Sequence, residues 1–150
     1  MFVAGPRSDS PANDLAELTL IGDLSHSALR ARMQRAAIFV SPARYEPFGL
    51  SALEAASAGC ALVLSDISTF RELWGGAALL VDPTDDRALH RVLARLCSDD
   101  RERARLQFAA RERAQNYSLA RTANAYRALY QRLLDTRSRF ASPHAMEVHA

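Results

Sequence analysis

Five short apolar runs, each ended by turn residues, lie within the first 83 residues and constrain the fold more than any other feature. They read FVAG (2–5), LTLIG (18–22), AIFVSP (37–42), ALVLSD (61–66) and AALLVDP (77–83). Apolar residues at helical spacing fill 25–36 and about 49–58 between them. Continuous apolar strands between helices are typical of a parallel sheet buried on both faces. The sequence therefore predicts an α/β fold, a Rossmann-like doubly wound parallel sheet with helices on both faces.

The remainder of the chain is predicted to be helical. The sequence Thr84, Asp85, Asp86 suits the start of a helix whose apolar face is formed by Leu89, Val92, Leu93 and Leu96. A helix over about 100–116 follows, and then one after Ser118 with an apolar face of Leu119, Ala123, Tyr126, Leu129, Tyr130 and Leu133. Because the pattern then ends, we expect one domain over 1–135 and a disordered tail over 136–150.

All 19 basic residues are arginine, and lysine is absent from the 150 residues. Residues 1–86 carry 6 arginines against 11 acidic residues, and residues 87–150 carry 13 against 6. The arginines of the second half alternate with acids and alanines, which favours a solvated helix face over a nucleic-acid-binding surface.

The cysteines and histidines form no recognisable site in the sequence. Cys60 and Cys97 make no disulfide framework, and the four histidines have no ligand spacing, so we expect neither a metal site nor histidine chemistry. No run has the length of a signal peptide's apolar core or approaches the roughly 20 apolar residues of a membrane span. These features predict a soluble, cytoplasmic protein without a resident cofactor.

The turn after the run at 37–42 is the candidate binding site. Gly49 allows backbone to approach a ligand, and the free N–H groups at about 49–52 form an anion site at a helix start. Glu54, one turn inside that helix, can accept hydrogen bonds from ribose hydroxyls, and Glu46 lies on the other side of the turn. The alternative is that Glu46 is a loop residue and Glu54 a solvent-facing helical residue.

The stretch EPFGLSALEAASAG resembles the signature E-P-F-G-L-x-x-L-E-A-x-A-x-G of the family 4 retaining glycosyltransferases, which have the two-domain GT-B fold. The resemblance covers about residues 2–134 and implies the C-terminal half, which binds the nucleotide-sugar (NDP-sugar) donor. It implies sugar transfer with retention and usually without a metal. The implied site comprises Glu46 at the donor sugar as the candidate catalytic residue, Glu54 at the ribose, amides of Phe48, Gly49 and Leu50 at the sugar and diphosphate, and the segment from Gly22 through Leu24 to Ser25 beside the base.

The chain departs from the family's pattern in its diphosphate clamp and its sheet. The Arg and Lys that follow the first strand in the family have no counterpart, although Arg44 or Arg71 can contribute charge. We also expect the chain to lack that first strand, which is central in the family's sheet. The runs at 2–5 and 37–42 must then pair directly, borrow a strand or keep unsatisfied edges.

Two functions from different classes follow from this resemblance. The first is the donor-binding half of a glycosyltransferase that transfers a hexose-type sugar from an NDP-sugar and is inactive without an N-terminal domain. Its expected partner through helix 119–134 is an N-terminal half or a second copy of the chain. The second is a non-catalytic module that binds a nucleotide sugar or a protein. Trp74 is expected to be a core or lid aromatic rather than a sugar platform, and Glu72 is either close to the donor sugar or a plain loop acid.

Overall fold

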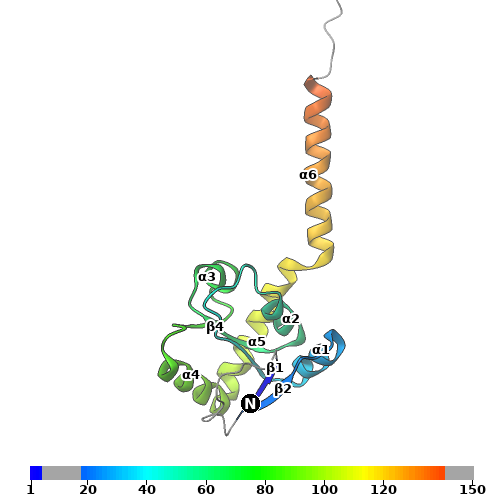
Figure 1. Cartoon of the computed structure of the whole chain (residues 1–150). Helices are drawn as coiled ribbons and strands as arrows, with labels where there is room; N and C mark the ends of the chain where they lie inside the picture. Colours follow the sequence, from blue (N-terminus) through cyan, green and yellow to red (C-terminus); the bar gives the residue numbers. More distant parts are fainter. Residues whose placement is uncertain (5–17, 141–150) are drawn as a thin grey trace, which may run out of the picture. The chain divides into compact units, whose positions relative to one another are not determined.

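Two parallel sheets appear in the computed structural model, which describes residues 1–4 and 18–140 (Figure 1). The chain divides into two compact units, Met1–Gln115 and Asn116–Ala150, and each is described by itself. The strands of the first unit are β1 (Phe2–Ala4), β2 (Thr19–Gly22), β3 (Ile38–Ser41), β4 (Ala61–Ser65) and β5 (Leu79–Val81). All five correspond to the predicted apolar runs.

The larger sheet has the order β3-β4-β5, with β4 in the centre. Ile38 pairs with Ala61 and Val63 with Leu79, and both strand pairs are parallel. Every residue of β4 is buried, because its side chains alternate between the two faces of the sheet and a core cluster covers each face. The α/β class and the parallel strands are confirmed.

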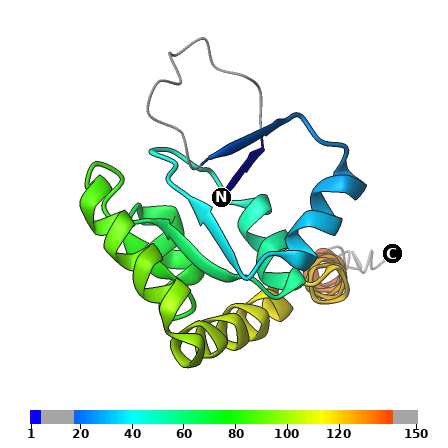
Figure 2. The same cartoon turned by 90° about the horizontal axis from the view of Figure 1, so that it is seen from below.

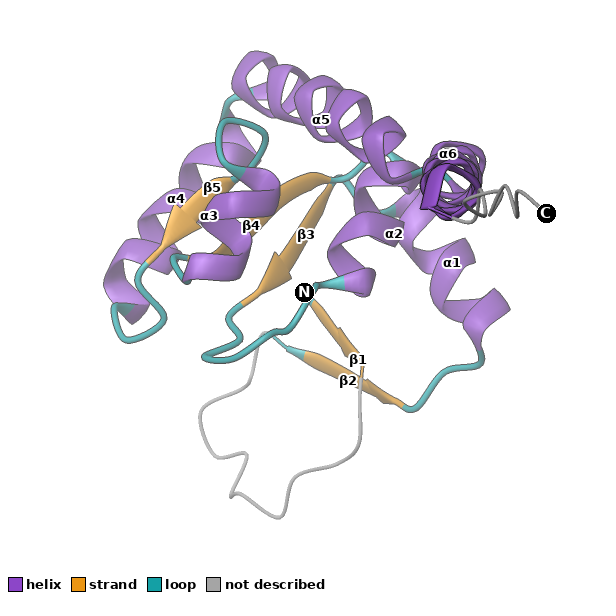
Figure 3. Cartoon of the chain, turned by 90° about the horizontal axis from the view of Figure 1, so that it is seen from above, coloured by secondary structure: helices purple, strands orange, loops and turns teal. Residues whose placement is uncertain are grey.

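Helices cover both faces of this sheet (Figure 2). The helices of this unit are α1 (His26–Arg35), α2 (Leu50–Ala58), α3 (Ser68–Trp74), α4 (Asp86–Ser98) and α5 (Asp100–Ala114), and η1 (Gln115–Tyr117) is a 3-10 turn after α5. Helix α1 packs against α2. The helices α2 and α4 lie on opposite sides of β4 (Figure 3). Leu62 and Leu64 of β4 belong to a core cluster with α2, whereas Ala61 and Val63 belong to a second cluster with Leu96 of α4. The sequence predicted all of the α-helices of this unit except α3.

The smaller sheet contains only β1 and β2, with Phe2 opposite Thr19. Within the described residues β1 forms no ladder with β3, so the direct pairing considered for these two strands does not occur. The prediction that both strands are buried was wrong, since Phe2 is 59% and Leu20 is 44% exposed. The physical reason is that a two-stranded sheet outside the larger one has few neighbours to cover it; the Arg32 guanidinium lies over the Phe2 ring at 4.4 Å.

The second unit consists mainly of α6 (Leu119–Phe140). It extends beyond the boundary at 135 that the sequence predicted, so 136–140 are helical, while 141–150 lie outside the described residues. Its apolar side chains are exposed, and the rings of Tyr126 and Tyr130 stack with centroids 6.3 Å apart. No helix among the residues described is both long and apolar enough to cross a bilayer.

Candidate functional site

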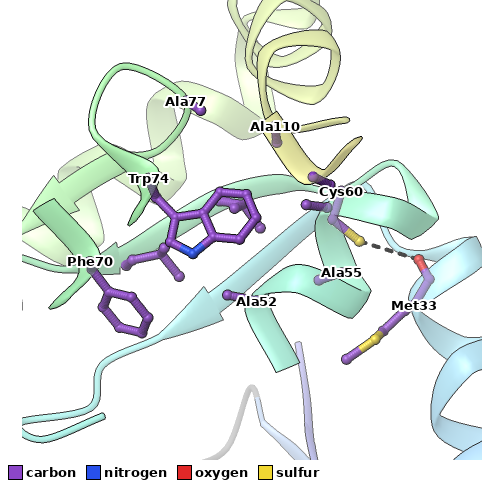
Figure 4. Close-up of a cluster of buried hydrophobic side chains, with 12 residues drawn as sticks. Met33, Ala52, Ala55, Cys60, Phe70, Trp74, Ala77 and Ala110 are labelled. Carbon is purple, nitrogen blue, oxygen red and sulfur yellow. Dashed lines mark hydrogen bonds between the residues drawn. The ribbon is translucent and has the colours of Figure 1, made fainter. Parts of the chain in front are cut away.

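The candidate site is the turn between β3 and α2, at the carboxyl end of the larger sheet. Gly49 caps the N-terminus of α2 with φ 81° and ψ 52°, a left-handed conformation that favours glycine. The ring of Phe70 lies beneath it, because a Cβ built on Gly49 would come within 2.7 Å of Phe70 Cε1. Phe70 is fully buried beside Trp74 in the core (Figure 4). The turn is thus supported from below by the core, and only glycine fits at its end.

Glu46 folds back onto the backbone of this turn. Its Oε1 accepts hydrogen bonds from the N–H of Gly49 at 2.9 Å and the N–H of Phe48 at 3.4 Å. A carboxylate at the positive end of a helix is stabilised there by the helix dipole. The Phe48 and Gly49 amides, which the sequence predicted to meet the ligand, are thus bound to Glu46 in this structure. Glu46 itself fixes the shape of the turn.

The first turn of α2 retains further amides for an anion. The first intrahelical bond runs from Leu53 N–H to the Gly49 carbonyl at 3.1 Å, so the N–H groups of residues 50–52 have no partner within the helix. Ala52, Ala55 and Ala56 are fully buried, and these small side chains let the helix lie close to the core (Figure 4). The buried alanines place Glu54 on the exposed face of α2, one turn from its start.

The Glu54 carboxylate is held by a residue that sequence reasoning had excluded from the site. His26 Nε2 lies 3.0 Å from Glu54 Oε1, and the two residues are 28 positions apart. Ser25 caps α1 by accepting a hydrogen bond from Ala28 N–H at 3.3 Å, which fixes the backbone at His26. This contact brings to Glu54 the residue that directly follows the segment from Gly22 through Leu24 to Ser25, which the sequence predicted beside the base. No motif or spacing in the sequence indicated it.

Of the two arginines considered for the diphosphate, Arg71 is already paired. Its guanidinium binds Asp66 in a two-pronged arrangement, with Nη2 2.8 Å from Oδ2 and Nε on Oδ1. The hydrogen bond and charge of Arg71 hold the pKa of Asp66 below its usual value, and Asp66 raises the pKa of Arg71. Arg44 is exposed in the loop before Glu46. The positive charge of Arg71 is therefore largely compensated before any ligand binds.

The other residues that the sequence singled out lie in the helices α3 and α4. Trp74 is 1% exposed in the core cluster, so its assignment as a core aromatic is confirmed. Glu72 is exposed on α3, and His90 is exposed on α4. Among the described residues, no three His, Cys, Asp or Glu side chains gather as metal ligands would.

A small cavity lies at the carboxyl ends of β3, β4 and β5. Its volume is about 30 Å³, and its lining includes Ser41, Ser65 and Asp82. The Thr84 backbone N–H and hydroxyl both donate to the Asp82 carboxylate, which holds the pKa of Asp82 below its usual value. This volume suits one or two waters rather than a nucleotide sugar.

Comparison with known proteins identifies several relatives of the chain. Over 95 residues the chain is 39% identical to a glycogen synthase of Mycobacterium tuberculosis (strain CDC 1551 / Oshkosh), a match of 62% of this chain and 23% of that protein. Over 109 residues it is 37% identical to a lipopolysaccharide core biosynthesis mannosyltransferase of Rhizobium leguminosarum bv. viciae, covering 70% of this chain and 31% of that one. The chain thus spans about a quarter to a third of these relatives.

The solved structure of sucrose-phosphate synthase from Thermosynechococcus elongatus superimposes with a TM-score of 0.76 at 25% identity, covering 90% of this chain and 38% of that one. The family model described as glycosyl transferases group 1 matches residues 12–113, which include the whole turn from Glu46 to Glu54. The chain belongs to the group 1 family of glycosyl transferases.

Proposed function

We propose that the chain is the NDP-sugar-binding, C-terminal half of a family 4 retaining glycosyltransferase that transfers a hexose-type sugar. One observation carries the proposal, namely the turn in which Glu46 holds the Gly49 amide and α2 then presents Glu54 at its surface. The relatives include a glycogen synthase and a mannosyltransferase, and their names support a hexose as the sugar.

Each residue of the turn has a distinct part in this proposal. Oε1 of Glu46 accepts the Phe48 and Gly49 amides, so its second oxygen is the one that meets a hydroxyl of the donor sugar. The amides at the start of α2, beginning with Leu50, bind the diphosphate. Glu54 accepts hydrogen bonds from the ribose, and the backbone of Gly22 and Leu24 lies beside the base.

The binding of a nucleoside diphosphate by this chain is expected to be weak. A diphosphate is normally held by charge-assisted hydrogen bonds, each worth about 1.5–3 kcal/mol. Here the chain has no lysine, and Arg71 is paired with Asp66. The loss of two such contacts weakens binding by roughly 100-fold or more.

Calorimetry with UDP, GDP and ADP tests the proposal. At least one of them should bind with a dissociation constant weaker than micromolar, and Glu54→Ala should lower that affinity more than Glu46→Ala. Glu46→Ala should act chiefly on the corresponding NDP-sugar. Glu112→Ala, on the exposed surface of α5, is the matched control. Submicromolar binding would contradict the incomplete clamp, and equal effects of Glu54→Ala and Glu112→Ala would contradict the ribose assignment.

The exposed apolar side chains of α6 support a further part of the proposal. Tyr126, Tyr130 and Leu133 are each more than half exposed along one helix. Contiguous apolar surface of this kind is usually covered by a partner. We propose that α6 binds an N-terminal half or a second copy of this chain, and sedimentation at increasing protein concentration tests the second possibility.

A further inference from the structure

We propose that His26 is a positioning residue for Glu54, holding its carboxylate ready for the ribose of the donor; this inference rests on the proposed function. The contact joins the first residue of α1 to the second turn of α2, with His26 Nε2 3.0 Å from Glu54 Oε1. An ionised carboxylate only accepts hydrogen bonds, so the imidazole Nε2–H donates.

Stability alone does not account for this pair. The His26 side chain is 75% exposed and that of Glu54 is 43% exposed. Ion pairs and hydrogen bonds between such exposed side chains contribute little to folding. The consequence of the contact is therefore geometric, because it selects one conformation of a side chain that otherwise samples many rotamers.

The His26 side of the contact is itself well anchored. Ser25 caps the N-terminus of α1 through Ala28 N–H, which fixes the backbone beside His26. At the other end of α1, the buried Cys60 thiol donates to the Met33 carbonyl at 3.3 Å (Figure 4). The C-terminal end of α1 is thus fixed to the core, and the local cap orders the helix start that carries the imidazole.

The geometry leaves Glu54 able to bind a diol while His26 holds it. A carboxylate has about four acceptor positions on two oxygens, and His26 uses one position on Oε1. The second oxygen and the remaining position on Oε1 can accept the two ribose hydroxyls. Since the side chain is ordered before the ligand arrives, the entropy cost of ordering it does not reduce the binding affinity.

Two substitutions separate positioning from mere presence of a side chain. In His26→Gln the amide nitrogen replaces imidazole Nε2 at the same number of bonds from Cα, whereas in His26→Asn it replaces Nδ1 and cannot reach Glu54. The probes are whichever of UDP, GDP and ADP binds most tightly and its 2′,3′-dideoxy analogue, measured by calorimetry. His90→Asn, at an exposed position of α4, is the control.

His26→Asn is expected to weaken binding of the ribonucleotide by about 2- to 12-fold, which corresponds to ordering one side chain on binding. His26→Gln should restore the affinity to within about twofold, a difference below the energy of one ordered side chain. Binding of the dideoxy analogue should be the same in all variants, and in the Glu54→Ala background His26→Asn should have no further effect.

The outcomes distinguish this inference from the proposed function. If Glu54→Ala weakens ribonucleotide binding but His26→Asn does not, or if Gln and Asn weaken it equally, the positioning role is wrong and the proposed function stands. If His26→Asn weakens the dideoxy analogue equally, His26 acts on the base or phosphate instead. If no nucleoside diphosphate binds, or Glu54→Ala has no effect, both are overturned.

Discussion

Replacement of Gly49 by alanine tests how the core shapes the candidate site. Two separate costs arise at this position. The backbone has φ 81°, which an alanine adopts only with strain, and the added Cβ would lie 2.7 Å from Phe70 Cε1 and 3.6 Å from Glu46 Cγ. Real Cβ atoms do not approach a carbon to 2.7 Å, so either the turn or the buried ring of Phe70 must move.

Gly59 provides the matched control because it carries only the first of these costs. It ends α2 with φ 96°, and a Cβ built there has nothing within 4 Å. Gly59→Ala should therefore lower the free energy of unfolding by about 1–2 kcal/mol, the cost of a left-handed residue with a side chain. Gly49→Ala adds the overpacking of the core, about 1–3 kcal/mol, for a total of about 2–5 kcal/mol.

Urea unfolding followed by circular dichroism measures both values by linear extrapolation. The expected result is that Gly49→Ala destabilises more than Gly59→Ala, and that Gly49→Ala costs less in a Phe70→Leu background than in the original chain, since leucine lacks the ring edge at Cε1. Phe70→Leu is measured alone as well, because truncating this buried ring has a cost of its own. Equal destabilisation by the two glycine substitutions would refute the argument that Phe70 supports the turn.

Three further predictions concern other parts of the chain. A thiol reagent should label Cys97, which is exposed, and leave Cys60 unlabelled until unfolding, because burial raises the pKa of the Cys60 thiol. Arg71 lowers the pKa of Asp66 in the folded chain. The Asp66 carboxylate therefore stabilises the fold at pH values above its unfolded pKa of about 3.9, and this stabilisation is lost as the pH falls through the lower pKa of the folded state. Asp66→Asn should therefore reduce the slope of stability against pH below about pH 4. Finally, the 150-residue chain alone should transfer no sugar from radiolabelled UDP-, GDP- or ADP-sugars, and transfer only with an added N-terminal half would identify a split enzyme.

The larger sheet could be predicted because burial on both faces leaves a direct signal in the sequence. The run ALVLS forms β4, and its four apolar residues alternate between two core clusters, as a strand buried on both faces requires. The start of α4 was also predictable, since aspartate is a preferred helix cap and the sequence places Asp85 before the apolar periodic residues. In the structure Asp85 accepts a hydrogen bond from Ala88 N–H at 2.8 Å. Such features depend on neighbouring residues along the chain.

Features that depend on length or on distant residues were not predictable in the same way. Helix α3 spans only Ser68–Trp74, too short for a periodic pattern, although Phe70 and Trp74 have the i, i+4 spacing of one buried face. The apolar composition of β1 and β2 predicted burial, but burial also requires a neighbour, and their sheet has two strands. The contact between His26 and Glu54 joins two different helices, so the residue pattern of neither helix alone could predict it.

The two glutamates illustrate how identical side chains acquire different parts from their surroundings. Glu46 is half-buried and one of its oxygens is bound to backbone amides, so it is held rigidly and only its other oxygen is available to a ligand. Glu54 is exposed and bound to an imidazole, so most of its acceptor capacity remains. A ligand hydroxyl at Glu46 must fit a fixed position, whereas a diol at Glu54 meets a carboxylate that a side chain has oriented. Under the proposed function, the first arrangement suits selection among sugars, and the second suits binding of a ribose diol.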